Sequence, residues 1–449
     1  MSRRRCALAL ALGLLLPAAA AAHPTAGPAG ALVVLATVAV GRHPVAMALD
    51  SAAGRLFVLD GGNYNPKAAP LQGSRVEVLS TASGKLLLTI PLSPTIYSSG
   101  GRPGYLALDR PHHRLYVIED GAYPAAPRDA PVDVRVLDSR TGATLGRASQ
   151  QALALAVDGA SGRAYSIAML PPSAPGFSYA LLDATSGTVL ASFGGRSPVG
   201  LGVAPTVGRV DVALTGSSPC PSKNPVCPNG ALVSFDARGA TLRASSPPIL
   251  SPYAVGIAGP PDRAFVGFLL PGIGSHDVRE RLNVLDAATG AQLSTIDDVG
   301  ITQYGVASDA RRGEAYVLGE RRGVRGLQVV DLRTGRLLRT LPTVLGSLPP
   351  YQLPGPGVRY RGVAEAALLA ADPSRNQLLG VAAAFGPALA NAPIPSTAYV
   401  EDERTGALLG QAPVGRDPSA LALDPATGHA FVANALDGTI TVLGLAPVP

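Results

Sequence analysis

The chain is poor in the residues that most often carry chemistry. Its 449 residues include no Trp, three Cys, three Met and six His, and charged residues make up only 15%. No Gly-x-Ser-x-Gly motif is present, which removes the nucleophile elbow of a serine hydrolase. The histidines are scattered and form no metal-binding motif. We therefore expect no cofactor and no resident metal, and the sequence favours binding over catalysis.

Long apolar runs are also missing. Outside the N-terminus, no segment offers the roughly 18 uninterrupted apolar residues that a membrane-spanning helix needs. The N-terminus has a basic start at Arg3–Arg5, an apolar run at Ala7–Leu16 and small residues up to Ala22. This is the pattern of a secretory signal peptide. We predict a signal peptide at 1–22, a linker at 23–30 and a monomeric, secreted or periplasmic protein without a transmembrane segment.

Positive charge is too thinly spread to indicate nucleic-acid binding. The formal net charge is +6, and removal of Arg3, Arg4 and Arg5 with the signal peptide would leave about +3, with no basic cluster. Two cysteines, Cys220 and Cys227, would remain in a segment rich in Pro, Ser and Asn. In an oxidising compartment we expect them to form a disulfide that ties a surface loop.

Glycine and proline, by contrast, are abundant. The chain has 52 Gly, 42 Pro and 47% hydrophobic residues, a composition typical of many short strands joined by tight turns. One unit recurs about every 50 residues. It contains an alternating strand that ends in Asp, a tight turn, a second strand, a variable loop, a third strand that ends in Asp, and an Asp-x-x-Thr-Gly turn into a fourth strand.

Eight copies of this unit are present. Their first strands are predicted at Val45–Asp50, Tyr105–Asp109, Leu153–Asp158, Val199–Ala204, Ala254–Ala258, Gly305–Asp309, Leu368–Asp372 and Ala420–Asp424. The turn after the third strand appears at Asp138–Gly142, Asp183–Gly187, Asp286–Gly290, Asp331–Gly335 and Asp402–Gly406, with degenerate versions at Ser80–Gly84 and Asp236–Gly239. We interpret the repeated aspartates as turn acceptors rather than catalytic acids.

The two ends of the chain complete each other. The eighth copy ends after a third strand at Thr439–Leu443, and the missing fourth strand is found near the N-terminus, because Gly30–Pro44 reads like Gly406–Pro418. Closing a ring with strands from both ends removes exposed sheet edges. We predict an all-β protein whose residues 31–449 form a single closed β-propeller of eight blades. Seven blades remain the alternative if the copy around Leu368 is an elaborated loop.

The last copy also carries a family resemblance. His429–Asn434 followed by Asp437–Val442 resembles the YVTN-type repeat of YncE-like propellers, and the resemblance covers nearly the whole mature chain. It implies a propeller fold but no single activity, because relatives with this repeat include extracellular binding proteins, surface-layer proteins and sugar lactonases. YncE-like proteins usually have seven blades, so the predicted eighth is a departure. The Asp-x-x-Thr-Gly turns also resemble those of quinoprotein dehydrogenases, but the absence of Trp weighs against that family.

Two groups of residues are candidates for binding, on the propeller face that carries the long loops. The blade connections place arginines, which suit carboxylate or phosphate ligands, near the channel mouth; the tyrosines stand in two loops and at two first-strand starts. The candidates are Arg42, Arg102, Arg196, Arg416, Tyr64, Tyr123, Tyr253 and Tyr304. Solvated arginines in Gly- and Pro-shaped turns, and ordinarily packed tyrosines, are the plainer interpretation.

The sequence thus predicts a non-catalytic binding or interaction scaffold that uses its long-loop face. The expected partners are a protein, a peptide or a cell-envelope component, or an anionic small molecule. The alternative is a metal-dependent, lactonase-like hydrolase at the propeller axis, which needs converging oxygen or nitrogen ligands; Asp60, Glu119 and Asp120 are the nearest candidates. A purely structural envelope repeat is a third hypothesis.

Overall fold

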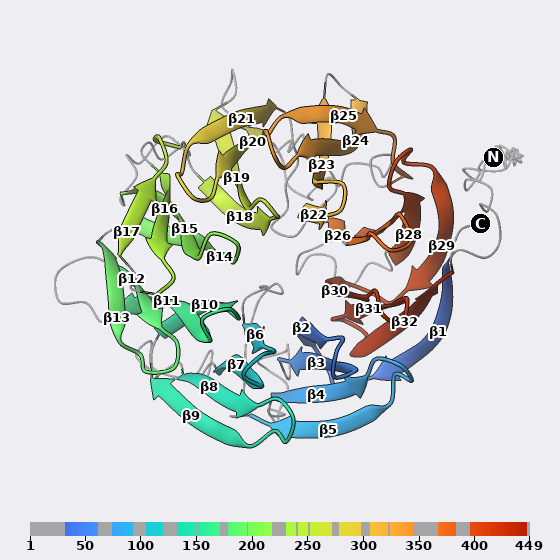
Figure 1. Ribbon diagram of the computed structural model, residues 1–449. Coiled ribbons are helices and arrows are strands. Elements are labelled where there is room, and N and C mark those ends of the chain that lie inside the picture. Colours follow the sequence, from blue (N-terminus) through green and yellow to red (C-terminus); the bar gives the residue numbers. More distant parts are fainter. Residues whose placement is uncertain are drawn as a thin grey trace, which may run out of the picture.

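Eight four-stranded antiparallel sheets stand around one axis in the computed structural model (Figure 1). The structure describes residues 32–61, 74–92, 105–119, 133–149, 151–170, 178–194, 196–217, 230–238, 241–249, 252–271, 278–297, 306–321, 324–344, 367–382 and 396–446. Each sheet is one blade, with its first strand nearest the axis and its fourth strand at the outer wall. The prediction of eight blades is confirmed, and the seven-blade alternative is wrong, because the copy around Leu368 forms a complete sheet.

The first four blades follow the predicted repeat. Blade 1 contains β2 (Pro44–Asp50), β3 (Arg55–Asp60), β4 (Arg75–Ser80) and β5 (Leu86–Pro91). Blade 2 contains β6 (Leu106–Asp109), β7 (Arg114–Glu119), β8 (Asp133–Asp138) and β9 (Thr144–Ser149). Blade 3 contains β10 (Gln151–Asp158), β11 (Arg163–Leu170), β12 (Ser178–Asp183) and β13 (Val189–Gly194). Blade 4 contains β14 (Arg196–Ala204), β15 (Arg209–Ser217), β16 (Ala231–Asp236) and β17 (Leu242–Ser245).

The last four blades continue the ring. Blade 5 contains β18 (Pro252–Ala258), β19 (Arg263–Pro271), β20 (Val278–Asp286) and β21 (Gln292–Asp297). Blade 6 contains β22 (Val306–Asp309), β23 (Glu314–Arg321), β24 (Val324–Asp331) and β25 (Leu337–Leu341). Blade 7 contains β26 (Ala367–Asp372), β27 (Gln377–Ala382), β28 (Ser396–Asp402) and β29 (Leu408–Val414). Blade 8 contains β30 (Pro418–Asp424), β31 (His429–Asn434), β32 (Thr439–Leu445) and, from the N-terminal part, β1 (Leu32–Ala39).

Strand β1 closes the ring, as predicted from the sequence. It pairs antiparallel with β32, with Leu32 opposite Leu445 and Ala39 opposite Thr439, and Figure 1 shows the blue strand along the outside of the red blade. The Val40 N–H continues the pairing by donating to the Gly438 carbonyl at 3.0 Å. Every blade is therefore packed between two others, so no blade presents an uncovered flat face.

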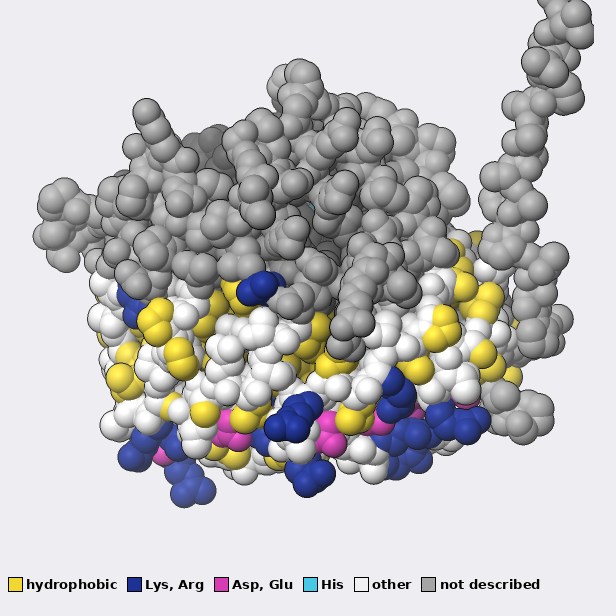
Figure 2. Space-filling view, turned by 90° about the horizontal axis from the view of Figure 1, so that it is seen from above, with side chains coloured by type: hydrophobic (Ala, Val, Ile, Leu, Met, Phe, Trp, Pro, Cys, Tyr) yellow, Lys and Arg dark blue, Asp and Glu magenta, His cyan; other side chains and the backbone are white. Residues whose placement is uncertain are grey.

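Within the described residues, the strands of one face of the ring are joined by short turns, and we call it the short-turn face. Every first-to-second turn has four residues and every described third-to-fourth turn has five or fewer; in Figure 2 this face forms the lower edge. In the turn after β8, Asp138 Oδ1 accepts the Arg140 and Thr141 N–H groups at 2.9 and 2.8 Å, and Gly142 takes a φ of 76°. The bond from Thr141 lowers the pKa of Asp138. The interpretation of these aspartates as turn acceptors is confirmed.

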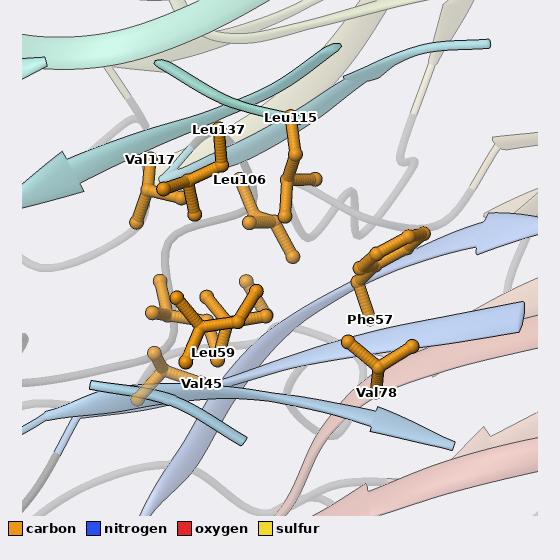
Figure 3. Close-up of a cluster of buried hydrophobic side chains, with 11 residues drawn as sticks. Val45, Phe57, Leu59, Val78, Leu106, Leu115, Val117 and Leu137 are labelled. Carbon is orange, nitrogen blue, oxygen red and sulfur yellow. The ribbon is translucent and has the colours of Figure 1, made fainter. Parts of the chain in front are cut away.

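The core lies between the blades, and one repeat position dominates it. The third residue of the second strand is aromatic in six blades and almost fully buried; these residues are Phe57, Tyr116, Tyr165, Phe265, Tyr316 and Phe431. Each packs against the next blade around the ring, as Phe57 does with Leu115 and Leu137 of blade 2 (Figure 3). Because large aromatic side chains bury the most apolar surface, this repeated contact holds neighbouring blades together.

Polar contacts also join successive blades at the short-turn face. The first residue of a second strand reaches across to a backbone carbonyl of the next blade. Arg55 Nη1 donates to the Ser139 and Arg140 carbonyls at 2.9 and 2.7 Å, and Arg263 Nη2 donates to the Arg333 carbonyl at 2.9 Å. The same position is used by Arg163, which bonds the Arg238 carbonyl, by Gln377, which bonds Ala446, and by His429, which bonds Thr81. These side chains serve the fold.

Candidate functional site

The long-loop face differs from the short-turn face in the length of its connections. Second-to-third connections range from residues 322–323 in blade 6 to 61–74 in blade 1, and the connection between blades 6 and 7 runs through 342–366. Several predicted candidates fall in these segments, outside the described residues; they are Tyr64, Arg102, Tyr123, Tyr304, Cys220 and Cys227. Tyr253 belongs to β18, but its side chain is outside the described part. Arg42, Arg196 and Arg416 are described.

Arg42 stands in the connection from blade 8 to blade 1. The Arg42 and His43 N–H groups both donate to Asp60 Oδ1, at 3.3 and 2.9 Å. Asp60 comes so close that a side chain at Gly41 would collide with its carboxylate. The backbone is thus held by a carboxylate at the end of β3, while the Arg42 side chain is exposed and forms no salt bridge within the described residues.

Arg416 stands at the equivalent place one blade earlier, in the connection from blade 7 to blade 8. Its backbone N–H donates to Asp437 Oδ2 and its Nε to Asp437 Oδ1, both at 2.6 Å. A side chain at Gly415 would collide with Asn434 and with the same Asp437 carboxylate. The Gly-Arg-x-Pro pattern therefore has a local explanation, because glycine lets a carboxylate approach the backbone and proline begins the inner strand, where it costs no ladder bond.

Each of these two connections also has a buried or partly buried titratable residue after its arginine. His43 is 7% exposed, and burial lowers its pKa, partly offset by the nearby Asp60 charge. Asp417 takes a φ of 54°, and burial raises its pKa to about 6. Below that pH Asp417 is neutral, and above it the group adds a negative charge beside Arg416.

Arg196 does not join this pair. Blade 4 lies opposite blade 8 in an eight-membered ring, and Figure 1 shows β14 across the axis from β2 and β30. Arg196 Nε lies 3.4 Å from the Thr215 carbonyl, and the Ser197 N–H donates to Thr215 Oγ1 at 3.2 Å. Of the three described candidates, Arg42 and Arg416 therefore lie together at one corner, formed by blades 8 and 1. Arg196 lies alone on the far side of the ring.

The carboxylates considered for an axial metal have other partners. Asp60 holds the Arg42 backbone and lies 3.5 Å from Arg75 Nε, and Glu119 pairs with Arg135 at 3.0 Å and Arg147 at 3.2 Å; Asp120 lies outside the described residues. The aspartates that end the inner strands are buried in the short turns. Within the described ranges, no group of three or more His, Cys, Asp and Glu side chains is arranged to hold a metal ion.

Sequence reasoning missed two kinds of residue. Asp60 and Asp437 were not recognised as the acceptors that fix the arginine connections, although the Asp437-Gly438 pair is a turn signal in its own right. The exposed arginines of the short-turn face were not recognised as a group either, because they lie in the turns of separate repeats and only the ring brings those turns onto one face.

Comparison with known proteins identifies the fold but no family. No family model and no curated protein sequence matches the chain. BamB from Moraxella catarrhalis superposes with a TM-score of 0.51 at 12% identity, over 92% of this chain and 100% of that one. The hydrazine synthase of Kuenenia stuttgartiensis gives a TM-score of 0.48 at 10% identity, over 91% and 97%. The described part of the chain contains no helix both long and apolar enough to span a bilayer. The chain is thus similar in fold to BamB.

Proposed function

We propose that this protein is an exported, non-catalytic binding scaffold that captures an acidic peptide or protein segment at the corner formed by Arg42 and Arg416. The propeller supplies a closed frame, and the connections of the long-loop face supply the variable surface. Export is proposed from the signal-like N-terminal sequence. Membership of the YVTN-repeat family stays a prediction from the His429–Asn434 motif.

One observation carries the proposal. Two successive blade connections repeat the same construction, in which a carboxylate from the frame fixes the backbone and an arginine is presented on the surface. Asp437 already orients the Arg416 guanidinium, whereas that of Arg42 forms no ion pair within the described residues. A pre-positioned arginine loses little freedom when it binds a carboxylate, which favours recognition of an acidic side chain or chain end.

The fold also supports a binding role. Asp60 and Glu119, the described carboxylates considered for a metal, are each close to an arginine. Loops of unequal length on a rigid frame are the usual place for recognition. The similarity to BamB supports the fold and does not bear on the ligand.

The test is a binding screen with a defined probe. An immobilised array of peptides that carry Asp and Glu would be probed with the protein and with Arg42→Ala/Arg416→Ala. We expect the double variant to bind the positive peptides at least about 100-fold more weakly, since each lost charged hydrogen bond costs about 1.5–3 kcal/mol and 1.4 kcal/mol is a tenfold change in affinity. Arg333→Ala/Arg404→Ala, on the opposite face, removes the same charge and should bind normally. Equal binding by all three proteins, or equal loss in both variants, would refute the proposal.

A further inference from the structure

The short-turn face is flat, because its turns have equal lengths. Every blade contributes a four-residue turn near the axis, from 51–54 in blade 1 to 425–428 in blade 8, and seven blades contribute a five-residue turn further out. Turns of equal length on equivalent strands end at the same height. The face therefore suits a broad, flat partner better than a single peptide or small molecule.

Arginines stand at one repeated position of the outer turns. The second residue after the turn aspartate is arginine in blades 2, 4, 6 and 7; these residues are Arg140, Arg238, Arg333 and Arg404, and all four are exposed. Their aspartates point back into the turn. In blade 2 the Arg140 side chain is 61% exposed and that of Asp138 only 17%, because Asp138 accepts the turn's N–H groups.

The inner turns separate charge in the same way. Asp109 and Asp309 are fully buried, while Arg110 and Arg311 beside them are exposed, the latter by 56%. The face thus contains both signs, but the cations lie outermost. Figure 2 shows dark blue side chains along the lower edge, with the magenta carboxylates set back above them. The carboxylates lie close behind, at 3.5 Å from Arg140 and 3.8 Å from Arg311, but they are the less exposed member of each pair, so a partner in contact with this face meets the guanidinium groups first.

A row of exposed leucines lies next to these arginines. The third residue after the turn glycine lies at the start of the outer strand, as its first or second residue, and is leucine; the exposed ones are Leu87 (53%), Leu145 (56%), Leu242 (57%), Leu293 (36%) and Leu338 (49%). Single surface leucines are ordinary, but recurrence at one repeat position is a pattern. Guanidinium groups beside leucines match the boundary of an anionic bilayer, where phosphates meet acyl chains.

We propose that the short-turn face is a peripheral docking surface for membranes rich in anionic lipids. The arginines contact lipid phosphates, and the leucines of the outer strands lie against the boundary between headgroups and acyl chains. A soluble polyanion would use the arginines alone, and a single peptide would not need a ring of equivalent sites. Docking in this way turns the long-loop face away from the membrane and does not depend on the function proposed for that face.

The experiment uses vesicle co-sedimentation of the full chain. Vesicles of phosphatidylglycerol mixed with phosphatidylcholine should bind the protein at least tenfold more tightly than phosphatidylcholine alone. Arg333→Ala/Arg404→Ala should weaken this binding roughly tenfold, whereas Arg42→Ala/Arg416→Ala, with the same loss of charge on the other face, should bind like the unaltered protein. Equal melting temperatures would show that all three proteins are folded.

A second pair of variants separates the membrane from other polyanions. Leu145→Ser/Leu338→Ser should weaken vesicle binding at least threefold and leave binding to heparin and to duplex DNA unchanged. If the leucine variant binds vesicles normally while the arginine variant loses vesicles and heparin alike, the face is a site for soluble polyanions and the membrane proposal is wrong. No preference for the anionic vesicles, or equal losses in both arginine variants, would overturn it as well.

Discussion

The seam between blades 4 and 5 differs from the other seven. At six seams a buried aromatic from the second strand packs on the next blade, and at the seam of blades 7 and 8 Leu379 does so. Blade 4 has Asp211 at this position, opposite Gly202 and Ser234. All three replace larger or apolar residues found in blade 1, where Phe57 lies opposite Ala48 and Val78.

The neighbouring blade compensates for the smaller residues. A side chain at Gly202 would lie 2.6 Å from Ile257 of β18, so Ile257 occupies space that the first strand leaves. The apolar cluster of this seam lies around Ala213, Val266 and Phe268, along the strands from Asp211. The repeat therefore needs filled volume between blades, supplied from either side, rather than an aromatic residue at each copy.

The largest expected effect breaks an ordinary seam. Phe431→Ala should destabilise the protein by about 3–5 kcal/mol, because it leaves a cavity among Leu56, Val58 and Val442 where the ring closes. The matched change at the unusual seam is Asp211→Ala, which removes a buried carboxylate and should not destabilise. Urea unfolding of both variants at pH 8 measures the difference. A similar loss in both would show that the two seams are equivalent.

The next effect concerns pH at the unusual seam. Asp211 is fully buried, and burial raises its pKa to about 7, with the Asp262 and Asp286 charges adding to the rise and Ser234 and Arg209 opposing it. A raised pKa means that the folded state holds the proton longer than the unfolded state. Stability should therefore fall as pH rises from about 4 to about 7 and then level off. Asp211→Asn should remove a part of this fall, on the order of 2–4 kcal/mol.

Other buried acids give the control for that measurement. Burial raises the pKa of both Glu401 and Glu403 to about 7. The pH dependence of stability in the unaltered protein is therefore the sum of the contributions of several such groups. Glu401 is held by Thr343 Oγ1 and the Val344 N–H at 2.7 and 2.8 Å. Glu401→Gln should remove the contribution of Glu401 to the fall in stability and leave the contribution of Asp211 unchanged. An Asp211→Asn variant with the full pH dependence would exclude Asp211 as a source.

The sequence predicted the fold well because each blade repeats the same local rules. Alternating strands, aspartate turn acceptors and the copy of Gly406–Pro418 at Gly30–Pro44 were enough to place eight blades and the closing strand. The Asp211 seam was not predicted, because one aspartate in a strand gives no sign of burial until the neighbouring blade is known. The arginines of the short-turn face were missed for a similar reason, since their grouping is a property of the ring.

The candidate site was only partly predictable. Arg42 and Arg416 were found from the repeated Gly-Arg-x-Pro pattern, but the pattern also selected Arg196, which lies across the ring. Equivalent positions of the repeat lie on the same face of the propeller, but they are close together only in neighbouring blades. The order of the blades around the ring is needed to know which blades are neighbours and which lie opposite each other. The sequence also could not tell that Arg55, Arg163 and Arg263 are used by the fold, because their acceptors are backbone carbonyls of the next blade.

The smallest expected effect tests those polar contacts between blades. Arg55→Ala removes two hydrogen bonds to blade 2 and should lower stability by about 1–2 kcal/mol, since the guanidinium is partly exposed and part of each bond is replaced by water. Arg114→Ala, at the same position in blade 2, should change stability by less than about 0.5 kcal/mol, because the Arg114 side chain makes no hydrogen bond within the described residues. Thermal unfolding of the two variants compares the sites directly. Equal melting temperatures would mean that aromatic packing alone holds blades 1 and 2 together, with no measurable contribution from the arginine.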